Sequence, residues 1–167
     1  MHPMRRKDRE VTDPAIMREV IEANTIVRLG FYDSEDPDFP YIVPMNYAPY
    51  FDGENIWLIM HGAKAGRRAE LLEKTRLCSF EIDGDLMYEV VWEEHDVTQR
   101  FRSIIGKGEI SLAEGDDKIR ALQYVVDRDE RSRGLTWNPK SANACLVPCL
   151  RITDMSCKQS LPGTGGD

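Results

Sequence analysis

The stretch that decides the fold is residues 40–76, PYIVPMNYAPYFDGENIWLIMHGAKAGRRAELLEKTR. Asp52-Gly53 reverses the chain there, because Asp-Gly between two apolar runs is a strong hairpin signal. The return run 56–60 is continuously apolar, which is typical of a strand buried on both faces, and it ends at His61. The first strand alternates with the period of two that a sheet requires, placing Ile42, Pro44 and Asn46 on one side and Val43, Met45 and Tyr47 on the other.

A glycine-marked bend and a helix follow this hairpin. Gly62 and Gly66 allow the backbone to bend closely, and apolar residues recur on one side of the segment after them. Lys64, Arg67 and Arg68 fall in the first turn of the helix, where each exposed cation opposes the helix dipole by roughly 0.3–1 kcal/mol. A phosphate would offset this charge, since free N–H groups and guanidinium forks both suit its oxygens. A solvated basic turn is the alternative interpretation.

Length and composition limit the class of protein. The chain has 167 residues, of which 41% are apolar, enough for one domain with a real core and too few for two ordinary ones. We expect this domain to cover residues 1–157 and residues 158–167 to form a disordered tail. The formal net charge of −7 disfavours nucleic acid and anionic membrane as partners. Without a membrane-spanning apolar run or a signal-like N-terminus, the sequence predicts a cytoplasmic protein.

The remaining segments predict a mainly β protein with peripheral helices. Asp13 is a plausible N-cap, followed by Pro14 in the first helical position. Asp83-Gly84-Asp85 predicts a second hairpin turn. Strands are expected over 25–32, 77–83, 87–92, 101–112 and 145–153, loops over 33–40 and 135–143, and a helix from 116 to 134. Hairpin spacing with three helical segments indicates an antiparallel β-barrel.

Metal and thiol chemistry receive no support from residue spacing. The four cysteines lack CxxC pairing, so no zinc ribbon or thioredoxin motif is indicated. Glu89, Glu93, Glu94, His95 and Asp96 form an acidic run that is interpreted as a solvated face, because no metal-ligand spacing accompanies it. We expect no structural metal site.

Three stretches resemble one family. They are residues 4–10 (MRRKDRE), residues 43–47 (VPMNY) leading through the hairpin to 61–68 (HGAKAGRR), and residues 102–108 (RSIIGKG). Together they resemble the flavin-binding split-barrel proteins related to pyridoxamine 5'-phosphate oxidase, within the branch of nitroimidazole-resistance reductases. The resemblance implies an antiparallel split β-barrel of the FMN-binding type, a homodimer with flavin at the interface, and FMN as cofactor.

The family pattern also implies roles for individual residues. His61 would touch the flavin or substrate as the candidate catalytic residue, and Ser103 would contact flavin across the subunit interface. Gly62 stands where relatives commonly carry a small hydroxyl residue, and the C-terminal signature of true pyridoxamine phosphate oxidases is missing, which argues against vitamin B6 oxidation. The full implied cofactor set is Val43, Pro44, Met45, Asn46, His61, Gly62, Ala63, Lys64, Gly66, Arg67, Arg68 and Ser103.

Three functions are compatible with this resemblance. The leading hypothesis is an FMN-dependent oxidoreductase that takes electrons from a nicotinamide donor and reduces a small aromatic or nitro substrate, with the redox chemistry supplied by the cofactor. A non-catalytic flavin-binding carrier or sensor is the second. A haem-handling relative is the third, and it would need an axial ligand for which only His61 is plausibly placed.

Overall fold

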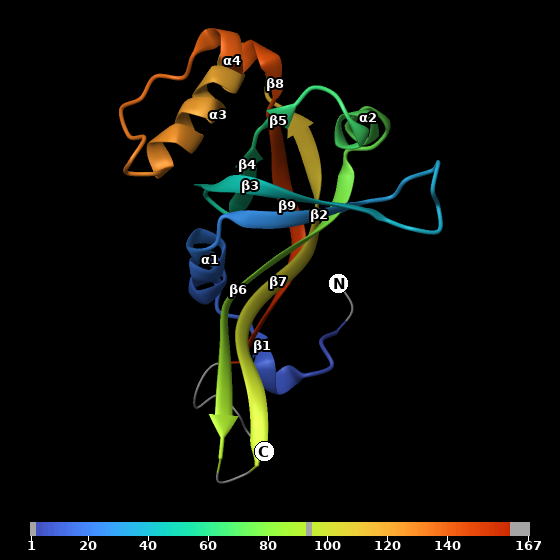
Figure 1. Cartoon of the computed structure of the whole chain (residues 1–167), viewed down its shortest axis with the longest axis vertical. Helices are drawn as coiled ribbons and strands as arrows, with labels where there is room; N and C mark the ends of the chain where they lie inside the picture. Colours follow the sequence, from blue (N-terminus) through green and yellow to red (C-terminus); the bar gives the residue numbers. More distant parts are fainter. Residues whose placement is uncertain (1–2, 93–94, 161–167) are drawn as a thin grey trace.

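A closed ring of antiparallel strands forms the body of the molecule (Figure 1). The computed structural model describes residues 3–92 and 95–160. The main sheet has the order β1-β9-β4-β3-β2-β6-β7, and an additional pairing of β9 with β7 closes the ring. The strands of this sheet are β1 (Glu10–Val11), β2 (Ile26–Phe31), β3 (Tyr41–Asp52), β4 (Asn55–Met60), β6 (Leu77–Val91), β7 (Asp96–Leu112) and β9 (Pro148–Ser160).

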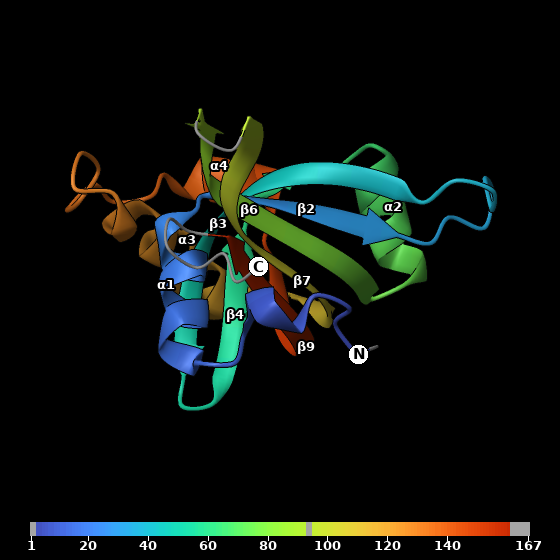
Figure 2. The same ribbon diagram turned by 90° about the horizontal axis from the view of Figure 1, so that it is seen from below.

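Helices and a small second sheet lie around the barrel. The second sheet pairs β5 (Gly62–Ala63) with β8 (Cys145–Leu146). Figure 2 shows α2 on one side of the barrel and α1 and α3 on the other. The helical segments are η1 (Lys7–Arg9), α1 (Pro14–Ala23), α2 (Arg67–Lys74), α3 (Gly115–Arg128) and α4 (Pro139–Ala144).

The barrel interior is the main hydrophobic core. Alternate residues of each strand point inward, so β2 contributes Val27, Leu29 and Phe31, each at most 2% exposed. Val20 and Ile21 of α1 are fully buried in the same cluster. Removing a side chain of this kind from water contributes roughly 1.5–3 kcal/mol, which is why the strand pattern alone specifies the register.

The predictions for residues 40–76 are confirmed. β3 and β4 pair from Tyr47↔Met60 to Asp52↔Asn55 around the Asp-Gly turn, and α2 follows the bend. The expected cap of α1 is also present, since the Asp13 side chain accepts a hydrogen bond from the Ala15 N–H at 2.8 Å. A register shift between Lys107 and Gly108 marks a bulge in β7.

The hairpin predicted at Asp83-Gly84-Asp85 is wrong. β6 runs unbroken from Leu77 to Val91, with only a register shift between Gly84 and Met87. Asp85 takes a left-handed φ of 55° as a single residue, which bends the strand without reversing it. Gly84 serves close packing instead of a turn, because a Cβ there would collide with the side-chain amide of Asn24.

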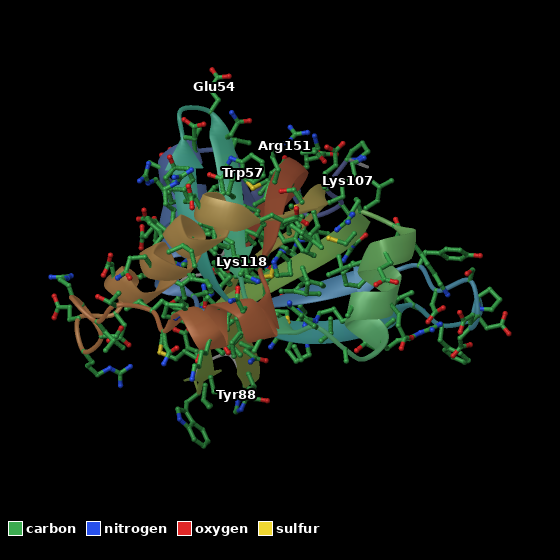
Figure 3. The ribbon with its side chains drawn as sticks, turned by 90° about the horizontal axis from the view of Figure 1, so that it is seen from above. Glu54, Trp57, Tyr88, Lys107, Lys118 and Arg151 are labelled. Atoms are coloured by element: carbon green, nitrogen blue, oxygen red, sulfur yellow. The ribbon has the colours of Figure 1, made fainter. Side chains whose placement is uncertain are left out.

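β6 and β7 therefore extend beyond the barrel as a two-stranded arm, drawn at the bottom of Figure 1. Tyr88 lies on this arm and points clear of the body (Figure 3), with 75% of its surface exposed. Residues 93 and 94, which belong to the predicted acidic run, lie outside the described residues.

The C-terminal third differs from expectation in three places. α3 ends at Arg128 instead of reaching Gly134. Residues 139–144 form α4 where a loop was expected, with the Asn138 side chain accepting from the Lys140 N–H at 2.9 Å. β9 continues to Ser160, paired with Phe101 of β7, so residues 158–160 belong to the sheet and not to a tail. Residues 161–167 lie outside the described residues.

Two kinds of feature are absent from the described residues. Within residues 3–92 and 95–160, no helix has the length and apolarity needed to span a membrane. Over the same part of the chain, no cluster of three or more histidine, cysteine, aspartate or glutamate side chains is arranged to hold a metal ion.

Candidate functional site

The two halves of the predicted site meet where β3 parts from its neighbour. β3 pairs with β4 only as far as Tyr47↔Met60, while its earlier residues pair with β2 alone. After Met60 the chain leaves β3, and Gly62 pairs with Leu146 of β8 instead. Strand pairing therefore stops between residues 43–46 and the segment 61–68, and this break in the sheet is called the opening below.

Arg68 bridges this opening. Its guanidinium lies 3.8 Å from the Met45 sulfur and donates to the Ala63 carbonyl at 2.8 Å. The residue is only 8% exposed. Within the described part of the chain, no carboxylate lies within salt-bridge distance of it.

An unpaired buried cation is costly, because desolvation disfavours the charged form. Burial accordingly lowers the pKa of the Arg68 guanidinium, and the nearby Tyr41 only partly opposes this. A side chain of this kind is expected where an anion from outside the chain completes the site. Arg68 therefore has the properties of an anion-binding side chain.

Two glycines shape the backbone around Arg68. A Cβ on Gly62 would lie 2.6 Å from the Arg68 Nη2, so any side chain at position 62 would displace the guanidinium. Gly66, with φ of 98°, precedes α2 and offers no side-chain cap. The backbone N–H groups of Arg67 and Arg68 precede the first hydrogen bond of α2, from Ala69 to the Gly66 carbonyl, and remain available as donors. The absence of a hydroxyl at position 62 is explained by the space that Arg68 needs.

Arg67 is in the opposite situation. It donates from Nε to Asp33 at 2.6 Å and makes a second contact to the same carboxylate through Nη2. It also donates to Glu35 at 2.9 Å and to Glu70 at 3.2 Å. These hydrogen bonds hold the pKa of the Asp33 carboxyl below its usual range. Carboxylates of the chain itself therefore offset the Arg67 charge for which the sequence predicted a phosphate.

The loop between β2 and β3 supplies two of these carboxylates and projects past α2 (Figure 1). Asp33 is 4% exposed and also accepts a hydrogen bond from the Glu35 N–H at 3.0 Å. Lys74, in the last turn of α2, pairs with Glu35. Arg67 is thus a positioning residue that fixes this loop against the helix.

Pro44 and Asn46 lie on the outer face of the barrel, whereas Val43 and Met45 face inward. The outer face continues across β2, β6 and β7, where a hollow of about 620 Å³ is lined by apolar Ile42 and Ile105 together with polar neighbours. The polar lining includes Arg28, which pairs with Glu81 at 2.9 Å, and Lys107 (Figure 3).

Ser103 is not brought to this site within one chain. It sits on β7 opposite Asp83 of β6, three strands from β3. With strands about 4.8 Å apart, this separation is roughly 14 Å. Its predicted contact with a cofactor beside Pro44 would require a second copy of the chain.

His61 is exposed and stacks edge-on against Trp137, with ring centroids 5.5 Å apart and an interplanar angle of 75°. The Trp137 Nε1 is buried without a hydrogen-bond partner in the described residues. Sequence reasoning placed Trp137 in a loop and missed this contact, because nothing local links positions 61 and 137. Lys64 and Ala63 are exposed at the same opening.

Comparison with known proteins gives a consistent assignment. The sequence profile of the family described as pyridoxamine 5'-phosphate oxidase matches residues 13–159. No curated protein matches the chain. One similar solved structure is a candidate 5-nitroimidazole antibiotic resistance protein from Bacteroides thetaiotaomicron, with a TM-score of 0.73 and 18% identity over 90% of this chain and 86% of that one.

Two further similar structures carry cofactors in their names. The flavocytochrome Anf3 from Azotobacter vinelandii has a TM-score of 0.75 at 21% identity, covering 96% of this chain and 73% of that one. The FAD and heme binding protein from Mycobacterium smegmatis has a TM-score of 0.74 at 16% identity, covering 91% and 73%. Similarities at this level of identity establish the split-barrel fold.

Proposed function

Since a profile match over residues 13–159 places the chain in the pyridoxamine 5'-phosphate oxidase family, we propose that it is an FMN-binding oxidoreductase. The observation that carries this proposal is Arg68, a buried guanidinium with no carboxylate partner in the described chain, set beside the uncapped start of α2. The flavin-binding names of similar structures support the same class of ligand.

The residues of the opening fit the terminal phosphate of FMN. Arg68 offers charge-assisted hydrogen bonds, the first turn of α2 offers N–H donors, and exposed Lys64 adds a second positive charge. Phosphate would supply the negative charge that Arg68 lacks. FMN is favoured over FAD because, of the two arginines that begin α2, only Arg68 lacks a carboxylate partner among the described residues.

The chain's own residues would bind and orient the cofactor and substrate. Pro44 and Asn46 border the opening from β3, and His61 stands exposed at its other side, where it is placed to position a substrate or deliver a proton. When bound, the flavin supplies the redox chemistry, carrying electrons from a nicotinamide donor to a small aromatic or nitro substrate.

The proposal includes a homodimer. Ile42 and Ile105 are 63% and 53% exposed on the outer sheet face, beside the hollow of about 620 Å³. Single exposed apolar residues are ordinary, but an apolar-lined hollow on a sheet face favours an interaction surface. A contact between Ser103 and the cofactor also requires a second copy, because one chain alone does not bring Ser103 to the opening.

The test combines binding and turnover. Purified protein is expected to be yellow or to become yellow on addition of FMN, and Arg68→Gln should weaken FMN at least thirtyfold while leaving riboflavin within threefold. Equal losses for both ligands would contradict the phosphate assignment. NADH or NADPH should then reduce the bound flavin without oxygen, and a nitroaromatic should reoxidise it. If no donor reduces the bound flavin, or if the reduced flavin reacts with no acceptor except oxygen, the protein would be assigned as a non-catalytic flavin-binding module.

A further inference from the structure

We propose that Asp33 and Glu35 determine the cofactor preference of the site by occupying Arg67, so that the site accepts a flavin mononucleotide and disfavours the dinucleotide FAD. This inference rests on the proposed flavin function and names residues that select between two flavins. Two adjacent arginines begin α2, yet only one is available to an incoming anion.

The contrast between the two arginines is the first step. Arg68 has a backbone carbonyl and a thioether as neighbours, whereas Arg67 has contacts to three carboxylates. Asp33 is buried and engages Arg67 through two nitrogens, which is the strong bidentate form of this interaction. Arg67 therefore presents no free guanidinium edge to a ligand.

The two flavins differ in the number of phosphates that the protein must bind. FMN ends in one phosphate, which Arg68 and the first turn of α2 can satisfy together. FAD carries a second phosphate one bridging oxygen away, and that group needs donors of its own. The other guanidinium in the first turn of α2 is Arg67, and the carboxylates of Asp33 and Glu35 pair with it. Like charges that approach each other in a partly desolvated site are repulsive, so a second phosphate is opposed there.

The loop itself provides a matched control. Asp36 and Asp38 belong to the same connection between β2 and β3 and carry the same charge, but neither contacts Arg67. Substituting them removes equal charge from the same loop without freeing the arginine. Asp33→Asn retains an oxygen that can accept the Glu35 N–H, so the turn is preserved in the test variant.

The experiment measures dissociation constants for FMN, FAD and riboflavin by flavin fluorescence. In Asp33→Asn/Glu35→Gln the ratio of the FAD constant to the FMN constant should fall about tenfold, the effect of one additional charge-assisted hydrogen bond. Asp36→Asn/Asp38→Asn should change that ratio less than twofold. Adding Arg67→Gln to the first variant should restore the wild-type ratio.

Each other outcome is decisive. An unchanged ratio in Asp33→Asn/Glu35→Gln, or an equal change in the control variant, would overturn the inference. If the test variant fails to fold, Arg67→Gln alone decides: it should alter FMN affinity less than threefold, and a loss as large as that of Arg68→Gln would overturn the inference. Wild-type protein that binds neither flavin would refute the proposed function as a whole, whereas wild-type preference for FAD would refute the choice of FMN and this inference and leave a flavin-binding function standing.

Discussion

Replacing Arg68 by methionine should stabilise the ligand-free protein and abolish its response to FMN. The wild-type residue is 8% exposed and donates to the carbonyl of Ala63 and, more weakly, to the sulfur of Met45. Losing that charged hydrogen bond costs about 1.5–3 kcal/mol, although the carbonyl belongs to an exposed residue and can turn to water. Removing the desolvated cation recovers several kcal/mol.

The free energy recovered by removing the buried cation exceeds the cost of the lost hydrogen bond, so the variant should be the more stable protein. We expect Arg68→Met to raise the free energy of unfolding by about 2 kcal/mol, in line with the gains seen when buried charges give way to apolar groups of similar size. For a chain of this length each kcal/mol corresponds to about 2–4 °C, so the melting temperature should rise by about 4–8 °C. This is the familiar opposition between stability and a functional charge.

With FMN added, the wild type should become more stable than Arg68→Met. At one hundred times its dissociation constant a ligand stabilises the folded state by about 2.7 kcal/mol, but if binding weakens a hundredfold the same concentration contributes only about 0.4 kcal/mol. The assay is urea unfolding of both proteins at one fixed concentration, with and without FMN, using Arg133→Met, at an exposed arginine outside the site, as the control. A variant less stable than wild type that still gains 2 kcal/mol or more from FMN would refute the reasoning.

The remaining predictions concern neighbours of the site and the core. Gly62→Ala should weaken FMN about tenfold, because its Cβ would displace the Arg68 guanidinium; wild-type affinity by fluorescence would argue against that packing. The difference in unfolding free energy between wild type and Asp33→Asn should be constant above about pH 5 and shrink as pH falls below about 4, because Arg67 lowers the Asp33 pKa in the folded state. Urea unfolding across this pH range measures the difference, and a difference that does not change with pH would contradict the ion pair. Cys78, whose pKa burial raises to about 12, should resist alkylation at pH 8 until the protein unfolds, as mass spectrometry can record.

Local signals predicted the centre of the molecule well. Asp52-Gly53 lies between two apolar runs, so turn chemistry and burial pattern agree on a single register. The same reasoning failed at Asp83-Gly84-Asp85, where a similar signal produces a bend within a strand. There the partner strand β7 is long enough to pair on both sides of the irregularity, and long-range pairing outweighed the local preference.

The structure separates the roles of two arginines that the sequence treated alike. The basic first turn of α2 indicated an anion, but three adjacent cations look alike in sequence. Arg67 finds Asp33 34 positions away, and Arg68 finds Met45 23 positions away. Such contacts depend on how β3 separates from the segment after β4, and the local sequence around either segment does not predict that separation. By contrast, Asn138-Pro139 carried a recognisable helix start that the prediction of a loop overlooked.

The most direct test of the account is an experimental structure of the protein with FMN bound. We expect the phosphate against the Arg68 guanidinium and the first turn of α2, with Arg67 still paired to Asp33. A phosphate held by Arg67 with its carboxylates displaced, or a flavin bound elsewhere while Arg68 contacts only Ala63 and Met45, would contradict it.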